Sequence, residues 1–356
     1  MMPEPGETID SMRALAVIPK RPGSAALVEI AEPPASDGAL LVDAVAVGVC
    51  GTDREIVDGA FGEAPPGHET LVLGHESLGR VVSAPAGLPF EPGDLVVGIV
   101  RRPDPVPCPN CAVGEWDMCR NGGYTERGIK RRHGYASERF RLEPEFAIPV
   151  APSLGGLGVL LEPASVVAKG WDQIDRIGHR TSWHPRTALI AGAGPIGLLA
   201  ALLAAQRGLD VHVLDRVTEG AKPALVHDLG ATYHTSLATT PAPDVIVECT
   251  GVPRLVIDSI QRVGPGGIVC LAGISGGSRV VDLDAAALSH HLVVDNVVVF
   301  GTVNANRRHW ALGAEALARA DRRWLERLIT RRFPLERWRE ALTPAPNDIK
   351  TVIEIA

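Results

Sequence analysis

Hydrophobic and polar positions follow two different patterns along the chain. Up to about residue 150, short apolar runs alternate with turns rich in Pro and Gly, such as the Glu-Pro-Gly-Asp turn at 91–94. This alternation is typical of antiparallel strands. The predicted strands cover residues 12–18, 40–49, 78–82 and 94–100. We therefore expect a mainly antiparallel β region in the first part of the chain.

From residue 187 onward, strand patterns and helix patterns alternate. Apolar runs typical of buried strands cover residues 187–191, 211–215, 245–248 and 268–272. Helical patterns between and after them cover residues 195–206, 221–229 and 253–263. Strands that alternate with helices form a parallel sheet covered on both faces. The sequence thus predicts an α/β fold with a doubly wound parallel sheet, followed by mixed helix and strand that ends in a strand at 351–355.

Composition narrows the class of protein without naming a function. The chain has 356 residues, 46% of them hydrophobic and 22% charged, which is an ordinary globular balance. At roughly 100–200 residues per domain, this length suggests two domains. The formal net charge of −7 gives no global positive field, so we expect no nucleic-acid partner.

The same sequence argues against a membrane protein or a secreted one. The most apolar run, at 196–205, is far shorter than the roughly 20 residues that a membrane helix needs. The first twelve residues are rich in Pro, Glu and Gly and lack the basic and then apolar pattern of a signal peptide. We therefore expect a cytoplasmic protein with no membrane partner.

Three of the six cysteines crowd into twelve positions. Cys108, Cys111 and Cys119 have the spacing C-x₂-C-x₇-C in a loop rich in Gly and Pro. In a reducing cytoplasm such a cluster more often binds metal than forms disulfides. The spacing indicates a closed structural zinc site, which requires four ligands. Free or partly oxidised thiols are the alternative.

A glycine-rich motif follows the predicted strand at 187–191 and opens the next helix. It consists of Gly192, Gly194 and Gly197, with Pro195 and Ile196 before the last glycine. The first glycine permits a tight turn, the second lets a pyrophosphate approach the backbone, and the third lets the helix pack on the strand. Amides at the helix N-terminus then face the phosphates. The motif predicts a dinucleotide site.

An acidic residue stands at the end of the next predicted strand. Asp215 is placed where a carboxylate would accept a hydrogen bond from the adenosine ribose, and it would repel a 2′-phosphate. Arg216 follows directly, and its guanidinium could stack on adenine or bind that same phosphate. Asp215 therefore favours NAD, while Arg216 leaves NADP open.

Two segments of the β region carry residues that bind zinc well. Cys50 follows a predicted strand, and His75 and Glu76 precede another. Thiolate, imidazole and carboxylate are all zinc ligands, and a catalytic zinc keeps one position open. A second Gly-His-Glu triplet at 67–69 follows two prolines and is predicted to be a loop, so we prefer His75. Taken singly, such a cysteine is more often a small core residue and such a histidine a surface group.

In their order along the chain, these motifs resemble the medium-chain, zinc-dependent alcohol dehydrogenase superfamily. The resemblance covers nearly the whole chain. Further segments are similar to the glucose dehydrogenase branch of that superfamily. The segments that carry the resemblance lie at 50–53, 74–81, 92–94, 108–119 and 192–197 for the superfamily, and at 100–103, 124–129, 133–135, 162–163, 248–253 and 301–304 for the branch.

The resemblance implies a GroES-like, mainly β catalytic domain and a Rossmann domain, with the active site in the cleft between them. We place the catalytic domain at 12–165, the Rossmann domain at 166–304 and the return to the catalytic domain at 305–356. It also implies that zinc binds through Cys50, His75 and either Glu76 or Glu162. One of these carboxylates would bind directly, and the other would exchange with it or act through water.

Further roles follow from the resemblance alone. Thr52 matches a hydroxyl that touches the substrate oxygen and starts a proton relay, although Glu55 stands where many relatives have a histidine. Arg101 and Glu126 match the branch at sugar-contacting segments, and Arg101 could instead merely pair with acids. Thr250 and Asn304 match the cofactor-binding segments, and Asn304 also matches a sugar contact. In the cysteine loop, Pro105 stands where the family has another cysteine, so the fourth ligand stays open.

The sequence as a whole predicts a zinc-dependent dehydrogenase that oxidises C1 of D-glucose or a related aldose to the 1,5-lactone with NAD or NADP. A polyol or secondary-alcohol dehydrogenase is the alternative in the same superfamily. A protein that binds NAD(P)H without catalysis and senses redox state is the alternative of another class. The apolar strand at 297–300 could pair with its copy across a two-fold axis, which predicts a homodimer or homotetramer unless the strand is internal.

Overall fold

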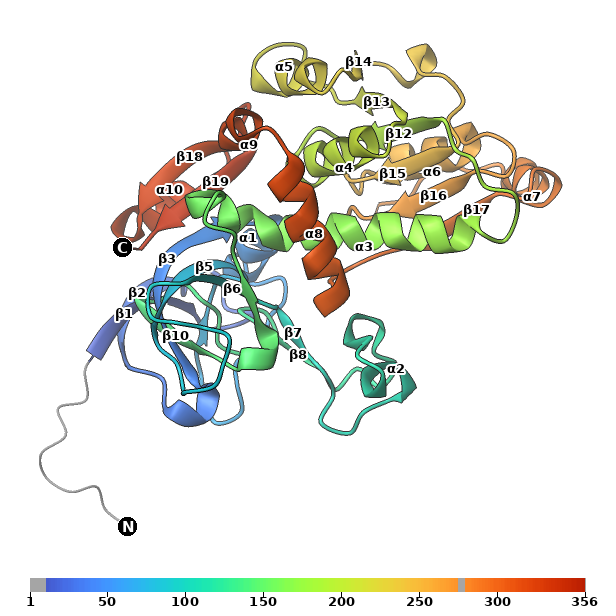
Figure 1. Ribbon diagram of the computed structural model, residues 1–356. Helices are drawn as coiled ribbons and strands as arrows, with labels where there is room; N and C mark the ends of the chain where they lie inside the picture. Colours follow the sequence, from blue (N-terminus) through green and yellow to red (C-terminus); the bar gives the residue numbers. More distant parts are fainter. Residues whose placement is uncertain (1–10, 275–278, 356) are drawn as a thin grey trace, which may run out of the picture. The chain divides into compact units, whose positions relative to one another are not determined.

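The computed structural model describes residues 11–274 and 279–355, and it divides into two compact units (Figure 1). The first unit comprises Met1–Glu162, Arg331–Pro344 and Thr351–Ala356. The second comprises Pro163–Thr330 and Ala345–Lys350. A β-rich unit and an α/β unit with a parallel sheet are the two parts that the sequence patterns predict.

The first unit is built on antiparallel strands, as predicted. Its largest sheet has seven strands in the order β11-β6-β5-β3-β19-β18, with β10 also pairing with β3. A three-stranded sheet in the order β2-β1-β4 and a small one in the order β7-β8-β9 complete the unit. The strands of the largest sheet are β3 (Leu40–Val49), β5 (Glu76–Ser83), β6 (Leu95–Gly98), β10 (Arg139–Leu142), β11 (Ala147–Pro149), β18 (Ile329–Pro334) and β19 (Lys350–Glu354). Those of the small sheets are β1 (Ser11–Val17), β2 (Ala26–Ala31), β4 (Leu71–Val72), β7 (Arg101–Arg102), β8 (Thr125–Arg127) and β9 (Arg131–Arg132).

The second unit contains a six-stranded parallel sheet in the order β14-β13-β12-β15-β16-β17. The chain moves outward from β12 in one direction and then from β15 in the other. Because crossover connections are right-handed, the helices of the two halves cover opposite faces of the sheet. The strands are β12 (Thr187–Ala191), β13 (Asp210–Leu214), β14 (Thr232–His234), β15 (Val245–Glu248), β16 (Ile268–Leu271) and β17 (Val298–Gly301). Strand β17 lies at one edge of this sheet, and the predicted pairing with a second copy requires an edge strand.

Helices α4 (Pro195–Gln206), α5 (Ala221–Asp228) and α6 (Pro253–Arg262) agree with the predicted helices to within one residue at each end. Sequence patterns missed α3 (Leu161–Gly178), in which the Trp171 indole donates to the Ala200 carbonyl of α4 at 3.3 Å. Other helices of the second unit are α7 (Ala285–Val294), α8 (Arg307–Arg319) and α9 (Arg322–Leu328).

The return of the chain to the first unit lies later than the expected residue 305. Helices α8 and α9 belong to the second unit, and the first unit resumes with Arg331–Pro344 and Thr351–Ala356. Hydrogen bonds hold both helices there: Gln206 Nε2 donates to the Ala316 carbonyl at 2.9 Å, and Trp324 Nε1 donates to the Leu225 carbonyl at 2.8 Å. The apolar faces of α8 and α9 give no sign of which unit they cover.

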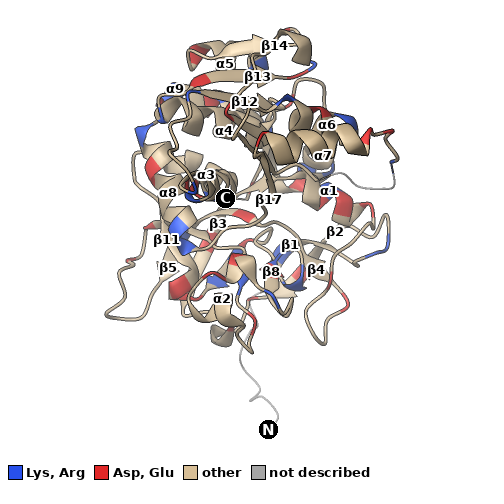
Figure 2. Ribbon diagram, turned by 90° about the vertical axis from the view of Figure 1, so that its right-hand side faces the viewer, with Lys and Arg blue, Asp and Glu red and all other residues tan. Residues whose placement is uncertain are grey.

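Each unit has its own hydrophobic core. In the first, Tyr135 and Phe140 meet edge to face with ring centroids 4.8 Å apart, inside a cluster that includes residues of β3 and β5. In the second, Leu189, Ile246 and Val269 of adjacent strands form the centre. Acidic and basic residues are interspersed along both units (Figure 2). No helix among the described residues has the length and apolar character needed to cross a membrane.

Candidate metal and dinucleotide sites

The pairing of two strands brings three candidate zinc ligands together. Cys50 directly follows β3 and is the N-cap of α1 (Gly51–Val57). Glu76 begins β5, and it lies opposite Gly48 in the antiparallel register of β3 and β5. Cys50 is therefore two residues beyond the paired position and reaches the same end of the ladder as His75. One donor atom from each of Cys50, His75 and Glu76 lies within 4.8 Å of the others.

Asp53 orients the imidazole ring of His75. Its Oδ1 lies 3.3 Å from His75 Nδ1, and its Oδ2 accepts a hydrogen bond from the Cys50 amide at 2.8 Å. His75 is 5% exposed, and its burial lowers its pKa. The charge and hydrogen bond of Asp53, together with Cys50, outweigh this burial and hold the pKa of His75 well above its usual value. A ligating histidine is commonly oriented in this way by a carboxylate on its other ring nitrogen.

The residues present fit a catalytic zinc. One thiol, one imidazole and one carboxylate make three ligands of the types that zinc prefers, and three protein ligands leave a fourth position for substrate. Among the described residues, Glu162 is not part of this donor group; it lies half-buried in the first turn of α3. His68 of the second triplet is also absent from it, since its ring packs against His133 with centroids 4.8 Å apart.

Thr52 lies in the first turn of α1, beside the donor group. Its Oγ1 is 3.9 Å from Cys50 Sγ, and the residue is half-buried. The hydroxyl is thus carried on the same turn as one candidate ligand. Glu55 also lies on α1.

The glycine-rich loop has the backbone geometry of a phosphate cradle. Gly192 directly follows β12 with φ of +106°, and Gly194 is the N-cap of α4, with Pro195 as the first helical residue. A Cβ on Gly197 would run into the Gly192 carbonyl oxygen. The loop leads into the N-terminus of α4, where backbone amides can face phosphate groups. It lies between β12 and β15, the point where strand order reverses and where such sheets bind ligands.

Asp215 lies directly after β13 and contacts the same loop. Its Oδ2 accepts a hydrogen bond from the Ala193 amide at 2.7 Å, and its Oδ1 accepts one from Val217 at 3.1 Å. The Lys222 ammonium is 3.3 Å from Oδ2. Burial raises the pKa of Asp215, but the two amides and Lys222 outweigh it and lower the pKa below its usual value. Arg216 is exposed. Sequence reasoning missed Lys222, because nothing in its helical pattern links it to Asp215.

Glu248 is a second residue that sequence reasoning missed. It is fully buried at the end of β15, where its Oε1 accepts hydrogen bonds from the Thr250 amide at 2.8 Å and from the Thr250 hydroxyl. The Gly251 amide donates to its Oε2 at 3.0 Å. Glu248 thereby fixes the loop that carries Thr250 next to Gly192. The signal for it in the sequence was a glutamate at the end of an otherwise apolar strand.

The expected sugar contacts Arg101 and Glu126 bind each other. They face one another across β7 and β8, and Arg101 Nε and Nη2 donate to Glu126 Oε1 at 3.1 and 2.9 Å. Both are buried, and the Arg101 guanidinium also lies over the Tyr124 ring, 3.8 Å from its centroid. Asn304 has a positive φ of +62° and accepts a hydrogen bond from the Ala305 amide.

The cysteine loop brings its three sulfurs together. Cys108, Cys111 and Cys119 have sulfur atoms within 4.8 Å of one another, and all six cysteines of the chain are free. Amide donors from Arg120 and Cys111 lower the pKa of Cys108 to about 6, whereas burial raises that of Cys111 to about 11. Among the described residues no fourth donor joins the group, and Asp104 instead accepts hydrogen bonds from Val106 and Gly123.

Comparison with known proteins identifies the family of the chain. Residues 36–152 match the alcohol dehydrogenase GroES-like domain, and residues 155–355 match the glucose dehydrogenase C-terminus. The glucose 1-dehydrogenase of Methanocella arvoryzae is 41% identical over 97% of this chain and 99% of its own, and glucose 1-dehydrogenase 2 of Vulcanisaeta moutnovskia is 39% identical over the same shares.

A solved structure agrees with these relatives. The Haloferax mediterranei glucose dehydrogenase in complex with NADP, Zn and gluconolactone matches with a TM-score of 0.88 and 32% identity, over 97% of this chain and 99% of that one. The match extends over both units. This chain therefore belongs to the medium-chain alcohol dehydrogenase superfamily, in its glucose dehydrogenase branch.

Proposed function

We propose that this protein is a zinc-dependent NAD(P) sugar dehydrogenase that oxidises the C1 hydroxyl of D-glucose or a closely related aldose to the 1,5-lactone. The observation that carries the proposal is the convergence of Cys50, His75 and Glu76 in a chain that also carries a dinucleotide cradle. The glucose 1-dehydrogenases among its relatives match nearly the full length of the chain and supply the substrate class.

Cys50, His75 and Glu76 would hold the zinc, and Glu162 would exchange with Glu76 or act through water. A bound zinc supplies a Lewis acid that lowers the pKa of a coordinated hydroxyl, and bound NAD(P)⁺ supplies the hydride acceptor. Asp53 orients His75 through Nδ1 and so leaves the other ring nitrogen for the ligand position. Glu76 begins β5, and Cys50 and His75 directly flank β3 and β5, so the sheet fixes the positions of the three residues.

Thr52 would take the proton of the substrate hydroxyl. Its Oγ1 can accept a hydrogen bond from the substrate and donate one onward, as a hydroxyl group has one donor and two acceptor positions. The place of Thr52 in the first turn of α1, 3.9 Å from Cys50 Sγ, supports this role.

For the sugar, Glu126 and Asn304 would accept and donate hydrogen bonds to the ring hydroxyls. Arg101 Nε and Nη2 both donate to Glu126 Oε1, so Arg101 would position this carboxylate toward the sugar. Discrimination among sugars depends on such buried polar groups, because a wrong sugar leaves them unpaired.

The cofactor would bind at Gly192, Gly194, Pro195, Ile196 and Gly197, with Thr250 and Asn304 at the nicotinamide end. Asp215 is already engaged by two amides and Lys222, and this engagement reduces its repulsion of a 2′-phosphate. Arg216 is exposed beside it and could bind that phosphate. Both NAD and NADP are therefore candidate cofactors.

The three clustered thiols would hold a second, structural zinc that fixes their loop. The free state of all six cysteines agrees with a cytoplasmic protein. Strand β17 leaves one edge of the parallel sheet unpaired within the described part of this chain, and pairing with a second copy would cover it in a homodimer or homotetramer.

The zinc ligands can be tested with the two Gly-His-Glu triplets of this chain. We expect His75→Ala to lose one equivalent of zinc per chain because the donor group loses its imidazole, and His68→Ala to keep the zinc content of the unmodified protein. Zinc per chain is measured by mass spectrometry after dialysis, with folding checked by circular dichroism. Full zinc content in a folded His75→Ala protein would contradict the assignment.

Thr52 can be tested with a nearly isosteric substitution. We expect Thr52→Val to lower kcat by about a hundredfold, since positioned proton transfer contributes on the order of 10²–10⁴. Thr52→Ser keeps the hydroxyl and should retain most of the rate. Steady-state kinetics across pH at saturating cofactor give the result. Equal kcat values for the Val and Ser variants would remove Thr52 from the proton path.

The substrate class is tested with the purified zinc-loaded enzyme on glucose, galactose, xylose, sorbitol and threonine. NAD⁺ and NADP⁺ are compared by the absorbance of the reduced cofactor. We expect turnover of glucose or another aldose, with the lactone trapped as its hydroxamate. Turnover of open-chain alcohols alone would indicate a polyol or secondary-alcohol dehydrogenase, and cofactor binding without turnover of any substrate would indicate a sensor.

A further inference from the structure

A cavity of about 600 Å³ lies wholly within the first unit, and none of the residues that line it has been assigned to zinc or sugar. Its wall comes from the loop around His68, the segment 131–134 that includes β9, and strands β2 and β10. This volume lies in the usual range for small-molecule sites, roughly 300–1,000 Å³. Five arginines line it, against two acidic residues, Glu32 and Asp37.

An excess of guanidinium groups surrounds one carboxylate behind this wall. Arg102, Arg127 and Arg132 all approach Glu143: Arg102 Nη2 is 2.8 Å and Arg127 Nη2 is 3.6 Å from Glu143 Oε2, and Arg132 pairs with its Oε1. These cations together lower the pKa of Glu143 to about 2, against the effect of its burial. The single carboxylate of Glu143 is thus shared by three guanidinium groups. Two of these, Arg127 and Arg132, line the cavity.

Arg127 is the most constrained of these cations. It is 5% exposed, and its Nη groups donate to the carbonyls of His133 and Arg141. Its Nε has no hydrogen-bond partner among the described residues, and the same is true of Arg132 Nε. Burial, followed in order by the charges of Arg102 and Arg132, lowers the pKa of Arg127 to about 10 although Tyr135 and Glu143 oppose this. A further anion would relieve this repulsion.

Two paired histidines belong to the same wall, and one of them can donate to a ligand. The Val72 amide donates to His133 Nδ1 at 3.1 Å, so the proton of a neutral His133 is on Nε2, which faces His68 Nδ1 at 3.3 Å. Burial, then the neighbouring His68 and Arg127, lower the pKa of His133 to about 4. A neutral His68 that accepts at Nδ1 carries its proton on Nε2, which can donate to a ligand.

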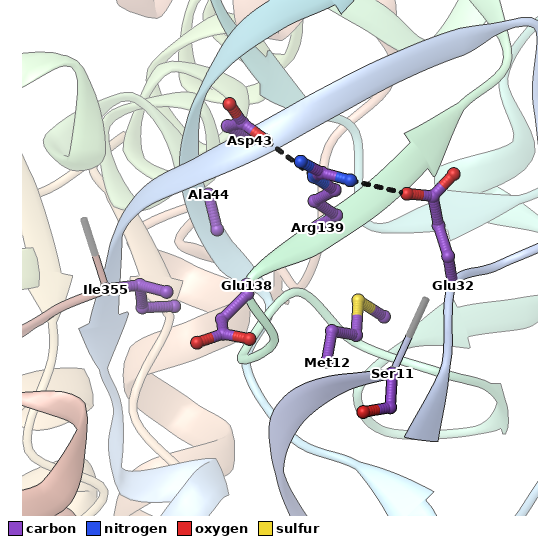
Figure 3. A pocket seen from close by; sticks show the side chains of 8 residues that line it. All are labelled: Ser11, Met12, Glu32, Asp43, Ala44, Glu138, Arg139 and Ile355. Atoms are coloured by element: carbon purple, nitrogen blue, oxygen red, sulfur yellow. Dashed lines mark hydrogen bonds and ion pairs between the residues drawn. The ribbon is translucent and has the colours of Figure 1, made fainter. Parts of the chain in front are cut away.

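At the other end of the cavity, acidic side chains compensate the charges of the arginines. Arg139, which also lines the pocket in Figure 3, is held between Glu32 and Asp43 at 2.8 and 3.0 Å. Glu32 also lies 3.6 Å from Arg141. Arg131 pairs with Glu63 at 2.5 Å. Asp37 faces Arg132 and His133 and offsets part of their positive field. The uncompensated charge is therefore concentrated at Arg127 and Arg132.

We propose that this cavity binds the phosphate group of a small phosphorylated metabolite, with Arg127, Arg132 and His68 as the anion-binding residues. Guanidinium forks suit tetrahedral oxyanions, and charge-assisted hydrogen bonds of this kind are among the strongest in proteins. Met12, Ile30 and Phe140 line the same cavity and can contact the carbon skeleton of the ligand. The site is independent of the sugar dehydrogenase activity proposed above.

Inorganic phosphate is the probe, titrated by calorimetry into the zinc-loaded enzyme at constant ionic strength set with chloride. Saturating NADPH is present so that the dinucleotide cradle is already occupied. We expect saturable binding that Arg132→Gln weakens by about tenfold or more, as loss of a charge-assisted bond implies. Arg132→Lys should recover part of it. The matched control is Arg332→Gln, because Arg332 pairs with Glu354 elsewhere on the unit and should leave phosphate binding unchanged.

Absence of saturable phosphate binding to the unmodified enzyme would overturn the proposal, and so would equal affinities of Arg132→Gln and the control. If Arg132→Gln does not fold, His68→Ala replaces it, because His68 is an exposed residue of the cavity wall and one of the three proposed anion-binding residues. A weakening of about threefold is then expected, the scale of one lost neutral hydrogen bond. An unchanged affinity in that variant would equally reject the site.

Discussion

The antiparallel pairing of β3 with β5 is the interaction on which the candidate metal site depends. Its register sets Gly48 opposite Glu76, and only this register brings Cys50 to the end of the ladder that carries His75 and Glu76. A shift by one residue would turn every side chain of the strand to the other face. The buried apolar face of β3 prevents such a shift, so core packing and ligand placement are enforced by the same contacts.

Hydrogen bonds around both sites fix their residues before any ligand arrives. Asp53 holds the Cys50 amide with one oxygen and faces His75 with the other, while Glu248 holds the loop of Thr250 beside the glycine cradle. Such preorganisation reduces the free-energy cost of ordering these groups upon binding.

Local patterns missed β14 and α7 but predicted the other strands of the parallel sheet and helices α4, α5 and α6 closely, because β12, α4 and β15, for example, each have an uninterrupted signal of their own. They did not predict α3, nor the unit to which α8 and α9 belong, because these depend on packing partners distant in sequence. The motifs identified the three candidate ligands. That these residues lie close together depends on the β3–β5 register, which the motifs do not specify. The Arg101–Glu126 pair and the arginines around Glu143 likewise arise from strand neighbours that no local pattern specifies.

The central claim is that Cys50, His75 and Glu76 share one zinc ion. Anomalous diffraction at the zinc absorption edge, on crystals of the active enzyme, tests it most directly. The account predicts a peak about 2.3 Å from the Cys50 sulfur and about 2.0–2.2 Å from a His75 nitrogen and a carboxylate oxygen. Fully active crystals with no anomalous peak among these three side chains would contradict it.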